Sequence, residues 1–506
     1  MMLDKNIENK INLVDEIVEQ LRFCQEEITN EEIGIVLDSG DGIARIGGLP
    51  NALLGEMLDF GEDVFGVVFN LEMEEIVAVI LERHVLVKEG HAVRRTGRII
   101  EVPVGDELLG RVIDPLGQPL DGMDAIDCKD HVPLETQPPG VIDRKPVDVP
   151  LQTGYMVIDA TVPIGHGQRE LIIGDRQTGK TTLAIDTIIN QKDKDVINIY
   201  VAIGQKNTTV AKVKKTLQEY DALKNTIIVN APASEPSATQ FYAPYAGCAI
   251  AEYFMRKGRR TLIIYDDLTK HAHAYRNISL LLKRPPGREA YPGDIFYVHS
   301  RLLERAAQLN DALGSGSMTA LPIVETQSGD ISSYIPTNVI SITDGQIFFT
   351  TELFNSNVRP AINPGVSVSR VGGAAQIKGM KKVAGLLRLT LAQFREKEKF
   401  SLFASDLDEK TLQQLTRGKV LIEVLKQKQH KPLYVIDQLI TLYTAINGFL
   451  DKTPLINIER VRTELIPHFK RTAPELYEKI EKDKNIDDSI IPQLSETITK
   501  CLEEIA

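Results

Sequence analysis

The chain has 506 residues, enough for roughly three domains of about 150 residues each. Apolar residues make up 43% and charged residues 25%, a balance typical of a folded globular protein that excludes a disordered chain. The 58 basic and 70 acidic residues leave a formal charge of −12, which argues against a protein that coats nucleic acid.

The chain shows no sign of a membrane span or a targeting segment. Its longest uncharged stretch, 236–251, contains two prolines and is shorter than the ~20 apolar residues of a span. The first residues are too acidic for a signal or transit peptide, so we expect any work at a membrane to depend on other chains. The four cysteines contain no CxxC pair, which favours reduced thiols in a cytosolic compartment: Cys24, Cys128, Cys248 and Cys501.

Residues 1–26 predict an amphipathic helix. Five aliphatic residues repeat at spacings of three and four and so share one stripe: Ile7, Ile11, Val14, Val18 and Leu21. The remaining faces are acidic. The stripe either folds back on the chain's own first domain or docks on a helix of a partner, and the pattern leaves both readings open.

Residues 27–97 predict a small all-β barrel. Short β-branched runs, several of them separated by Gly or Asp turns, are typical of closely spaced strands. The expected strands cover 33–37, 42–46, 64–69 and 76–81, and a further expected strand, 98–102, follows the expected end of the barrel near Gly97.

Residues 98–378 predict an α/β nucleotide-binding domain. A connector rich in Pro and Gly is followed by apolar runs that alternate with helical stretches such as 210–223. This alternation indicates a mostly parallel sheet covered on both faces. The apolar runs are 171–173, 196–203, 226–229 and 261–265.

Residues 379–506 predict a helical C-terminal domain, because strand patterns stop near Gly379. Helical periods cover 386–403, 411–428 and 434–450, and prolines 432 and 454 interrupt them. The predicted fold is therefore a multidomain α/β protein with an N-terminal barrel, a central P-loop domain and a C-terminal helical bundle.

The strongest local motif is a phosphate-binding loop. Eight residues after an apolar run match G-x-x-x-x-G-K-[ST]: Gly174, Asp175, Arg176, Gln177, Thr178, Gly179, Lys180 and Thr181. Glycines let backbone N–H groups curl around phosphates, and the following helix N-terminus favours negative charge. Lys180 is expected to neutralise the β- and γ-phosphates, and the Thr181 hydroxyl to bind Mg²⁺.

An acid at the end of a neighbouring strand completes this prediction. The run 261–265 leads directly into Asp266, which we expect behind the magnesium ion, through a water molecule. Together the two motifs predict a site for MgATP or MgADP.

At this point the chain resembles the alpha subunits of F-type ATP synthases. The motifs that carry the resemblance are spread from about residue 31 to 450 and lie at 174–181, 200–206, 262–267, 284–294, 337–345, 367–372 and 425–429. The resemblance implies a β-barrel, a RecA-like domain and a helical domain, in the order that the residue patterns predict.

The resemblance also implies an assembly and a place in the cell. It implies an alternating ring of three alpha and three beta subunits around a gamma shaft, to which 285–294 would contribute a sleeve loop. It implies docking of the N-terminal helix on the delta subunit of the peripheral stalk and an indirect link to the membrane rotor. The expected place is the cytoplasmic face of a bacterial plasma membrane, and no nucleic-acid partner is expected.

Site roles follow from the resemblance residue by residue. Gln177 would join Lys180 at the phosphates. Arg370 looks like an arginine presented to the catalytic site of the neighbouring beta subunit, and Ser367 is a required position in the same segment. The adenine end of the pocket would be lined by Phe354, Arg359, Pro360, Gln427 and Gln429.

Two other classes of protein are alternatives to an alpha-type subunit: a self-sufficient hexameric ATPase and a RecA-like nucleic-acid motor. The acidic balance and the lack of an RNA-binding aromatic motif count against the motor. Gln205 separates the first two classes, because a hydrolytic member should carry Glu there to activate water. An amide can hydrogen-bond water but cannot take its proton.

Three histidines depart from common members of the family. His271 and His273 form an HxH pair, but residues two apart on a helix face different directions, which favours a solvated or hydrogen-bonded helix over a metal site. His430 stands where Tyr is expected after the paired glutamines. These departures leave the ATPase subtype and the coupling ion, proton or sodium, open.

Overall fold

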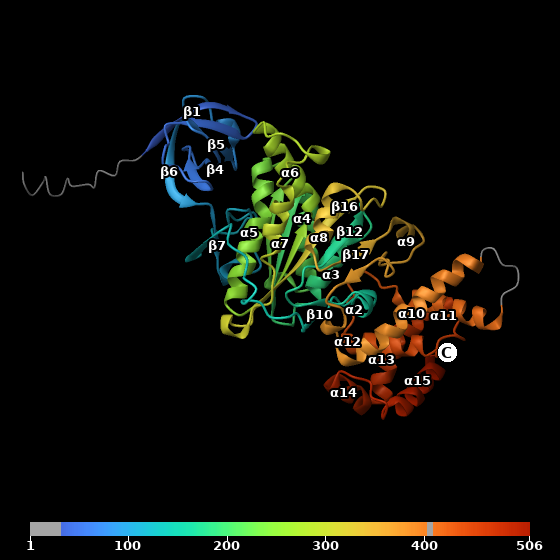
Figure 1. The fold of residues 1–506 in the computed structure, drawn as a ribbon. Helices are drawn as coiled ribbons and strands as arrows, with labels where there is room; N and C mark the ends of the chain where they lie inside the picture. Colours follow the sequence, from blue (N-terminus) through green and yellow to red (C-terminus); the bar gives the residue numbers. More distant parts are fainter. Residues whose placement is uncertain (1–31, 402–407, 506) are drawn as a thin grey trace, which may run out of the picture. The chain divides into compact units, whose positions relative to one another are not determined.

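The computed structural model describes residues 32–401 and 408–505. The described chain divides into two compact units between Ile99 and Ile100. The first contains a β-barrel, and the second contains both a nucleotide-binding domain and a helical domain (Figure 1). The predicted fold class is confirmed. The predicted helix over 1–26 lies outside the described residues.

The first unit is a closed barrel of six antiparallel strands in the order β1-β2-β5-β4-β3-β6. Its inward side chains form one apolar core that includes Val36, Ile46, Leu58 and Val93. Closure pairs β1 with β6 and so leaves no free edge. The strands are β1 (Ile33–Gly40), β2 (Ile43–Gly47), β3 (Glu56–Asp59), β4 (Phe65–Leu71), β5 (Glu75–Ile80) and β6 (Ala92–Ile99).

The single strand predicted over 98–102 is divided between two strands in the structure. The chain ends β6 at Ile99, and a separate strand β7 (Glu101–Val104) begins two residues later in the second unit. The β7 strand pairs with β9 (Asp130–Pro133) rather than with the barrel. A continuous β-branched run therefore crosses from one unit into the next, and local pattern alone cannot detect that change of partner.

The second unit is built on an eight-stranded sheet in the order β18-β17-β12-β16-β15-β13-β14-β8. Every neighbouring pair is parallel except β17 and β18. The strands are β8 (Val112–Ile113), β12 (Leu171–Asp175), β13 (Val196–Gln205), β14 (Thr226–Pro232), β15 (Arg260–Asp266), β16 (Ser317–Thr326), β17 (Gly345–Phe349) and β18 (Val368–Ser369). A small antiparallel pair, β10 (Pro150–Leu151) and β11 (Ile164–Gly165), lies outside this sheet.

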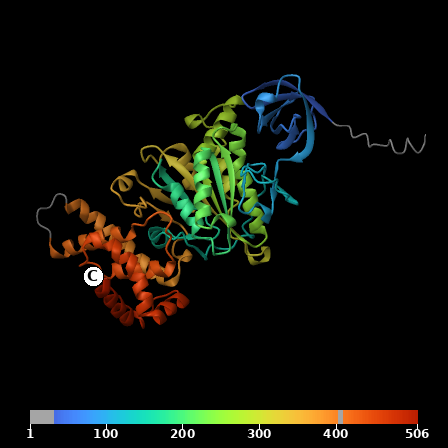
Figure 2. The ribbon, with the colours of Figure 1, turned by 180° about the vertical axis from the view of Figure 1, so that it is seen from behind.

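Helices cover both faces of the sheet, as the views from opposite sides show (Figures 1 and 2). This cover explains why central strands such as β13 read as continuous apolar runs, since side chains on both faces are buried. The helices of this part of the unit, of which α2 and α9 lie beside the sheet rather than on its faces, are α2 (Met156–Thr161), α3 (Lys180–Ile189), α4 (Asn207–Glu219), α5 (Ser237–Arg256), α6 (Leu268–Leu281), α7 (Ile295–Leu303), α8 (Tyr334–Ile342) and α9 (Thr351–Asn355).

The C-terminal part of the second unit is helical, as predicted. Its core residues, among them Leu421, Leu439 and Phe469, belong to the same apolar cluster as Ile172 and Ile264 of the sheet. The helices are α10 (Lys378–Ser401), α11 (Glu409–Leu425), α12 (Val435–Ile446), α13 (Ile458–Thr472), α14 (Pro474–Asp483) and α15 (Ile491–Ile505). The continuous core allows side chains of the helical part to complete a pocket that begins on the sheet.

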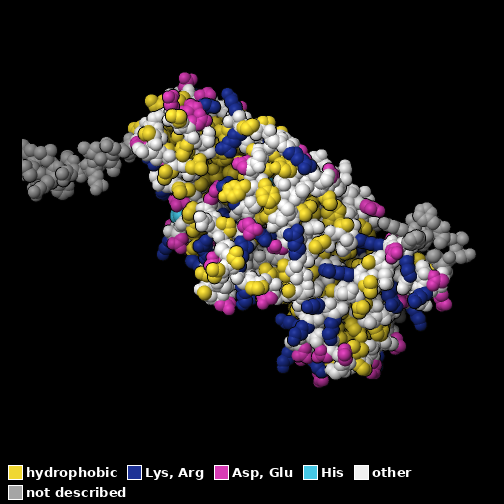
Figure 3. Space-filling view, in the orientation of Figure 1, with side chains coloured by type: hydrophobic (Ala, Val, Ile, Leu, Met, Phe, Trp, Pro, Cys, Tyr) yellow, Lys and Arg dark blue, Asp and Glu magenta, His cyan; other side chains and the backbone are white. Residues whose placement is uncertain are grey.

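Other sequence expectations concern thiols and membranes. Cys128, Cys248 and Cys501 are buried free thiols, and Cys24 lies outside the described residues. Within 32–401 and 408–505, no helix combines the length and apolarity needed to cross a bilayer. On the face seen in Figure 3, Lys and Arg side chains are interspersed with Asp and Glu over the C-terminal helices.

Candidate nucleotide-binding site

The predicted phosphate loop connects β12 to α3 at the carboxyl end of the sheet. Gly174 has φ of +154° and packs so closely on β17 that a Cβ atom there would lie 2.5 Å from the carbonyl oxygen of Phe349. Gly179 has φ of +105°, a conformation that favours glycine, and it caps α3. The loop then turns back on itself, and the Lys180 ammonium donates to the carbonyl oxygen of Gly174 at 2.7 Å and to that of Asp175.

Asp266 ends β15 next to this loop and gathers three donors. Its carboxylate accepts hydrogen bonds from the Thr181 hydroxyl at 2.8 Å, the Tyr200 hydroxyl at 2.7 Å and the Gln205 amide at 3.0 Å. These residues come from three neighbouring elements, α3, β13 and β15, because the carboxyl ends of parallel strands share one edge of the sheet. Thr181 and Asp266, the two residues expected at the magnesium ion, are therefore neighbours in the structure.

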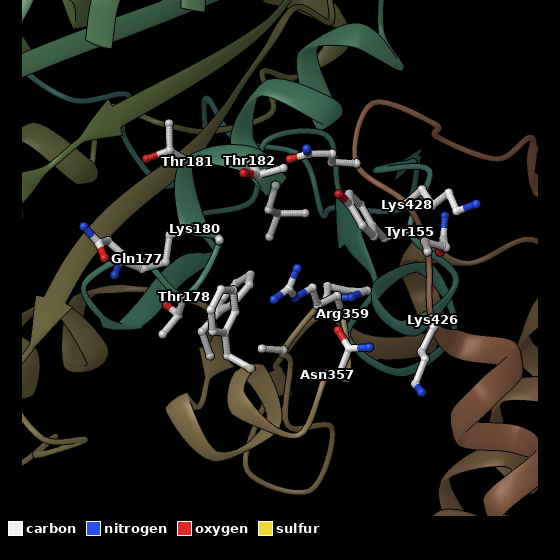
Figure 4. Close-up of a pocket in the computed structure, with 18 of the residues that line it drawn as sticks. Tyr155, Gln177, Thr178, Lys180, Thr181, Thr182, Asn357, Arg359, Lys426 and Lys428 are labelled. Atoms are coloured by element: carbon white, nitrogen blue, oxygen red, sulfur yellow. The ribbon is translucent and has the colours of Figure 1, made fainter.

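A pocket of about 920 Å³ extends from this edge toward the helical part of the unit. In Figure 4 the loop residues Gln177, Lys180 and Thr181 lie on one side, and Arg359 and Lys428 lie on the other. The predicted residues that line the pocket are Gln177, Thr178, Gly179, Lys180, Thr181, Gln205, Asp266, Phe354, Arg359, Pro360, Gln427 and Gln429. Its volume lies within the usual range for small-molecule sites.

The predicted adenine end combines an apolar surface with polar groups. The Arg359 guanidinium lies 4.6 Å from the ring centroid of Phe354, so the cation holds the aromatic face in place. Gln427 is buried, and its amide is used within the chain: it accepts from the backbone N–H of Met156 at 2.7 Å and donates to the carbonyl of Gly154 at 2.9 Å. Gln429 is exposed at the pocket, so of the two glutamines it is the one whose side chain can meet a ligand.

Three residues of the predicted loop do not line the pocket: Gly174, Asp175 and Arg176. The Asp175 carboxylate accepts from Thr326 at 2.6 Å and from Thr351 at 2.9 Å, and so ties the loop to β16 and α9. Burial would raise the pKa of Asp175, but these hydrogen bonds lower it. The Arg176 guanidinium pairs with Glu325 at 2.7 Å. The side chains of Asp175 and Arg176 therefore support the loop from outside.

The structure does not bring Arg370 and Ser367 to this pocket. Strand β18 pairs with β17 so that Ser369 faces Gly345 at the amino end of the sheet. The phosphate loop leaves the opposite end, four residues or roughly 13 Å along the strands. Arg370 is exposed, and no carboxylate of the described residues pairs with its guanidinium. Ser367 is buried; its hydroxyl donates to the Asn363 carbonyl at 2.7 Å and accepts from Phe348 N–H at 2.9 Å.

The sequence did not predict a cluster of hydrogen bonds around Asp186 that connects the pocket to the C-terminal part of the unit. Asp186, on the helix that follows the phosphate loop, accepts from the Tyr155 hydroxyl and from the backbone N–H of His430, whose Nδ1 lies 2.7 Å from the same carboxylate. Tyr200 was also assigned no role. The partners lie up to 244 residues apart, so no spacing in the sequence signals them.

The residues present fit a nucleotide with its magnesium ion. Hydroxyl and carboxylate oxygens of Thr181 and Asp266 are the hard ligands that Mg²⁺ prefers, and such sites characteristically use few protein ligands beside phosphate and water. A Cβ at Gly174 would collide with β17, so the loop conformation that exposes N–H groups depends on glycine. Thr181 and Asp266 would hold the ion, and the ion would neutralise phosphate charge.

The HxH pair lies outside the pocket. His271 is buried against Phe241, with its Nε2 3.1 Å from the Phe241 carbonyl oxygen, and His273 stacks on Tyr291. The hydrogen-bonded alternative is therefore confirmed for His271, and the solvated one is wrong for it. The ring of His299 lies 5.4 Å from that of His271, and neither of its nitrogens has a hydrogen-bond partner among the described residues.

His299 predicts acid sensitivity of the fold. Burial lowers its pKa to about 4, below the ~6.5 of an unfolded chain, so its contribution to stability is complete above pH 6.5 and is lost as the pH falls toward 4. At pH 5 the loss amounts to about 2 kcal/mol. We expect His299→Phe to reduce the fall in Tm between pH 7.5 and pH 5. His131→Phe, at an exposed position, should leave that fall unchanged, and equal falls in wild type and His299→Phe would contradict the prediction.

The parallel sheet and the glycine-bounded loop, with Thr181 and Asp266 at its edge, define a P-loop nucleotide-binding protein of the RecA-like type. Three family models match the chain: the ATP synthase alpha/beta family, nucleotide-binding domain, at 154–369; the C terminal domain of the alpha/beta chain, at 376–501; and the beta-barrel domain, at 30–97. The chain belongs to the ATP synthase alpha/beta family.

One relative indicates which subunit type of the family the chain is similar to. ATP synthase subunit alpha of Pediococcus pentosaceus is 58% identical over 473 residues, which cover 94% of this chain and 94% of that protein. The resemblance to alpha subunits that the motifs indicate is thereby confirmed.

Proposed function

We propose that the chain is the nucleotide-binding, non-catalytic alpha subunit in the F1 sector of a rotary ATP synthase. The complex would make ATP from ADP and phosphate with a transmembrane ion gradient. The chain would bind MgATP or MgADP in its own pocket without turning it over, and it would supply Arg370 in trans to the catalytic site of the adjacent beta subunit.

The observation that carries the non-catalytic role is the Gln205 amide. It lies at the carboxyl end of β13 and donates to Asp266, beside the phosphate end of the pocket. A hydrolytic site needs a carboxylate there to orient and deprotonate water, and an amide has no proton-accepting charge. Glu325 also lines this end, but its carboxylate accepts a hydrogen bond from Arg176 at 2.7 Å and is engaged within the chain.

The position of Arg370 supports action on another subunit. It lies at the amino end of the sheet, whereas its own phosphate loop lies at the carboxyl end. Burial raises the pKa of the Glu170 carboxyl, and the charge of Arg370 opposes that rise. Arg370 is nevertheless exposed and forms no ion pair with a carboxylate of the described residues, so its guanidinium can still reach phosphate oxygens outside this chain. The planar, permanently charged fork suits the equatorial oxygens of a transferring phosphoryl group.

The remaining roles follow from the family. We propose beta, gamma and delta subunits as partners, with the helix predicted at 1–26 docking on delta and the loop 285–294 facing gamma. Residues 285–290, 293 and 294 of this loop are exposed, which supports the latter role. The complex would hold the chain at the cytoplasmic face of a bacterial plasma membrane and link it indirectly to the membrane rotor.

The test is nucleotide binding without turnover by the purified full-length chain. MgATP at 100 times its Kd should stabilise the fold by about 2.7 kcal/mol, since the nucleotide binds the folded state. Phosphate release should stay at the background of a Lys180→Ala control. Steady-state hydrolysis by the chain alone that Lys180→Ala abolishes would instead assign it to the self-sufficient ATPases.

A further inference from the structure

The backbone on both sides of Arg370 is held by its own chain, although the arginine side chain is exposed. The Ser369 hydroxyl donates to the Pro163 carbonyl at 2.7 Å and accepts from Gln168 and from the N–H of Gly372, each at 3.2 Å. The N–H of Arg370 itself donates to the carbonyl oxygen of Asp344 at 2.8 Å. The backbone position from which the Arg370 side chain extends therefore depends on where Asp344 lies.

Asp344 in turn forms four hydrogen bonds with Arg169. The Arg169 Nε and Nη2 atoms donate to the two carboxylate oxygens at 3.0 and 2.9 Å, as a bidentate pair. The backbone N–H of Arg169 donates to the same carboxylate at 3.0 Å, and the N–H of Asp344 donates to the Arg169 carbonyl at 2.8 Å. The Arg169 side chain is 14% exposed, so the pair is shielded from solvent enough to hold one geometry.

A second carboxylate anchors this pair to the body of the domain. The Nη1 atom of Arg169 also pairs with Glu304, and Arg144 donates to the carboxylate and to the carbonyl of Glu304 at 3.1 and 2.7 Å. Arg169 precedes β12 by two residues, and Asp344 precedes β17 by one. The network therefore joins the amino ends of β12 and β17, and β17 pairs with β18, the strand that Arg370 follows.

We propose that the Arg169–Asp344 pair positions Arg370 for its action in trans. The inference rests on the proposed function of Arg370. The pair touches no nucleotide site in this chain and acts only through the Asp344 carbonyl, so both are positioning residues rather than catalytic ones. Positioning matters here because a misplacement of about 1 Å in a reacting group can reduce a rate by about 10²-fold.

The first test removes the charge of the Asp344 carboxylate from the Arg169–Asp344 pair and keeps the size of the side chain. In a reconstituted complex of alpha, beta and gamma subunits, Asp344→Asn should reduce steady-state ATP hydrolysis about tenfold to a hundredfold. Binding of ATP to the alpha pocket should be unchanged, because the pocket lies at the other end of the sheet. The matched control is Asp121→Asn, which disrupts a bidentate pair with Arg111 of the same chemistry, at 2.7 and 3.0 Å. It should leave turnover near wild type.

The second test asks whether Asp344 acts through Arg370. In an Arg370→Lys background, Asp344→Asn should cause no further loss of turnover, because the group it positions is already gone. Trapping of MgADP with fluoroaluminate, a mimic of the transferring phosphoryl group, should be weakened in each single variant and no more in the double variant. If Asp344→Asn prevents assembly, Arg169→Lys serves instead, since it keeps the charge and loses the fork.

The outcomes separate the two hypotheses. Normal turnover of Asp344→Asn, or losses that multiply in the double variant, would overturn the positioning role. Near-normal turnover of Arg370→Lys alone would overturn the proposed function of Arg370, and the inference would fall with it. Loss in each single variant without further loss in the double variant supports both.

Discussion

Replacement of Arg370 by lysine should slow ATP hydrolysis by the reconstituted alpha–beta–gamma complex by about 10³-fold or more. Arginine fingers contribute about 10³–10⁵ in rate, and lysine keeps the charge but loses the planar fork. ATP binding at the alpha pocket should be unaffected, because Arg370 lies at the opposite end of the sheet from the phosphate loop.

The measurement for Arg370 is phosphate release by the complex together with direct ATP binding to the alpha pocket. Arg460→Lys is the matched control: it changes another exposed arginine, on α13, that pairs only with Glu464 among the described residues. Near-normal turnover, or lost alpha-site binding with turnover intact, would remove Arg370 from the proposed role.

Replacement of Lys180 by methionine should weaken ATP binding to the alpha pocket about 100-fold. Methionine keeps the length of the side chain, so the loss reports the ammonium, whose hydrogen bonds to a charged phosphate contribute about 1.5–3 kcal/mol. Burial lowers the pKa of Lys180, whereas Glu325, Asp267 and Asp266 oppose that shift. Phosphate oxygens add negative charge and would favour the ammonium further.

Equilibrium binding of radiolabelled ATP to the full-length chain measures this change. Lys426→Met is the control, because Lys426 lines the other end of the pocket and pairs with Glu423 at 2.6 Å. It should alter the Kd much less. Equal losses in the two variants would mean that the phosphates do not lie at the glycine-bounded loop.

The class of fold could be predicted from the sequence, and so could the cluster of residues around the glycine-bounded loop. Lys180 and Thr181 lie in one eight-residue loop, and Asp266 ends an apolar run. Such features depend on local backbone geometry and strand polarity, which short patterns encode. The order of barrel, sheet and helices could be predicted for the same reason, because apolar residues repeat at different spacings in strands and in helices.

The tertiary structure decided where each predicted residue lies and what it contacts. The sequence could not show that the Gln427 amide forms hydrogen bonds with the backbone of Gly154 and Met156. It also could not show that Asp186 accepts hydrogen bonds from Tyr155 and His430. These contacts span up to 273 residues of the sequence. It also could not place Arg370 at the end of the sheet opposite its own loop, a result of the antiparallel pairing of β18 with β17. Local periodicity determines which strands and helices form, whereas packing between distant segments determines which side chains face the ligand and which hold the scaffold together.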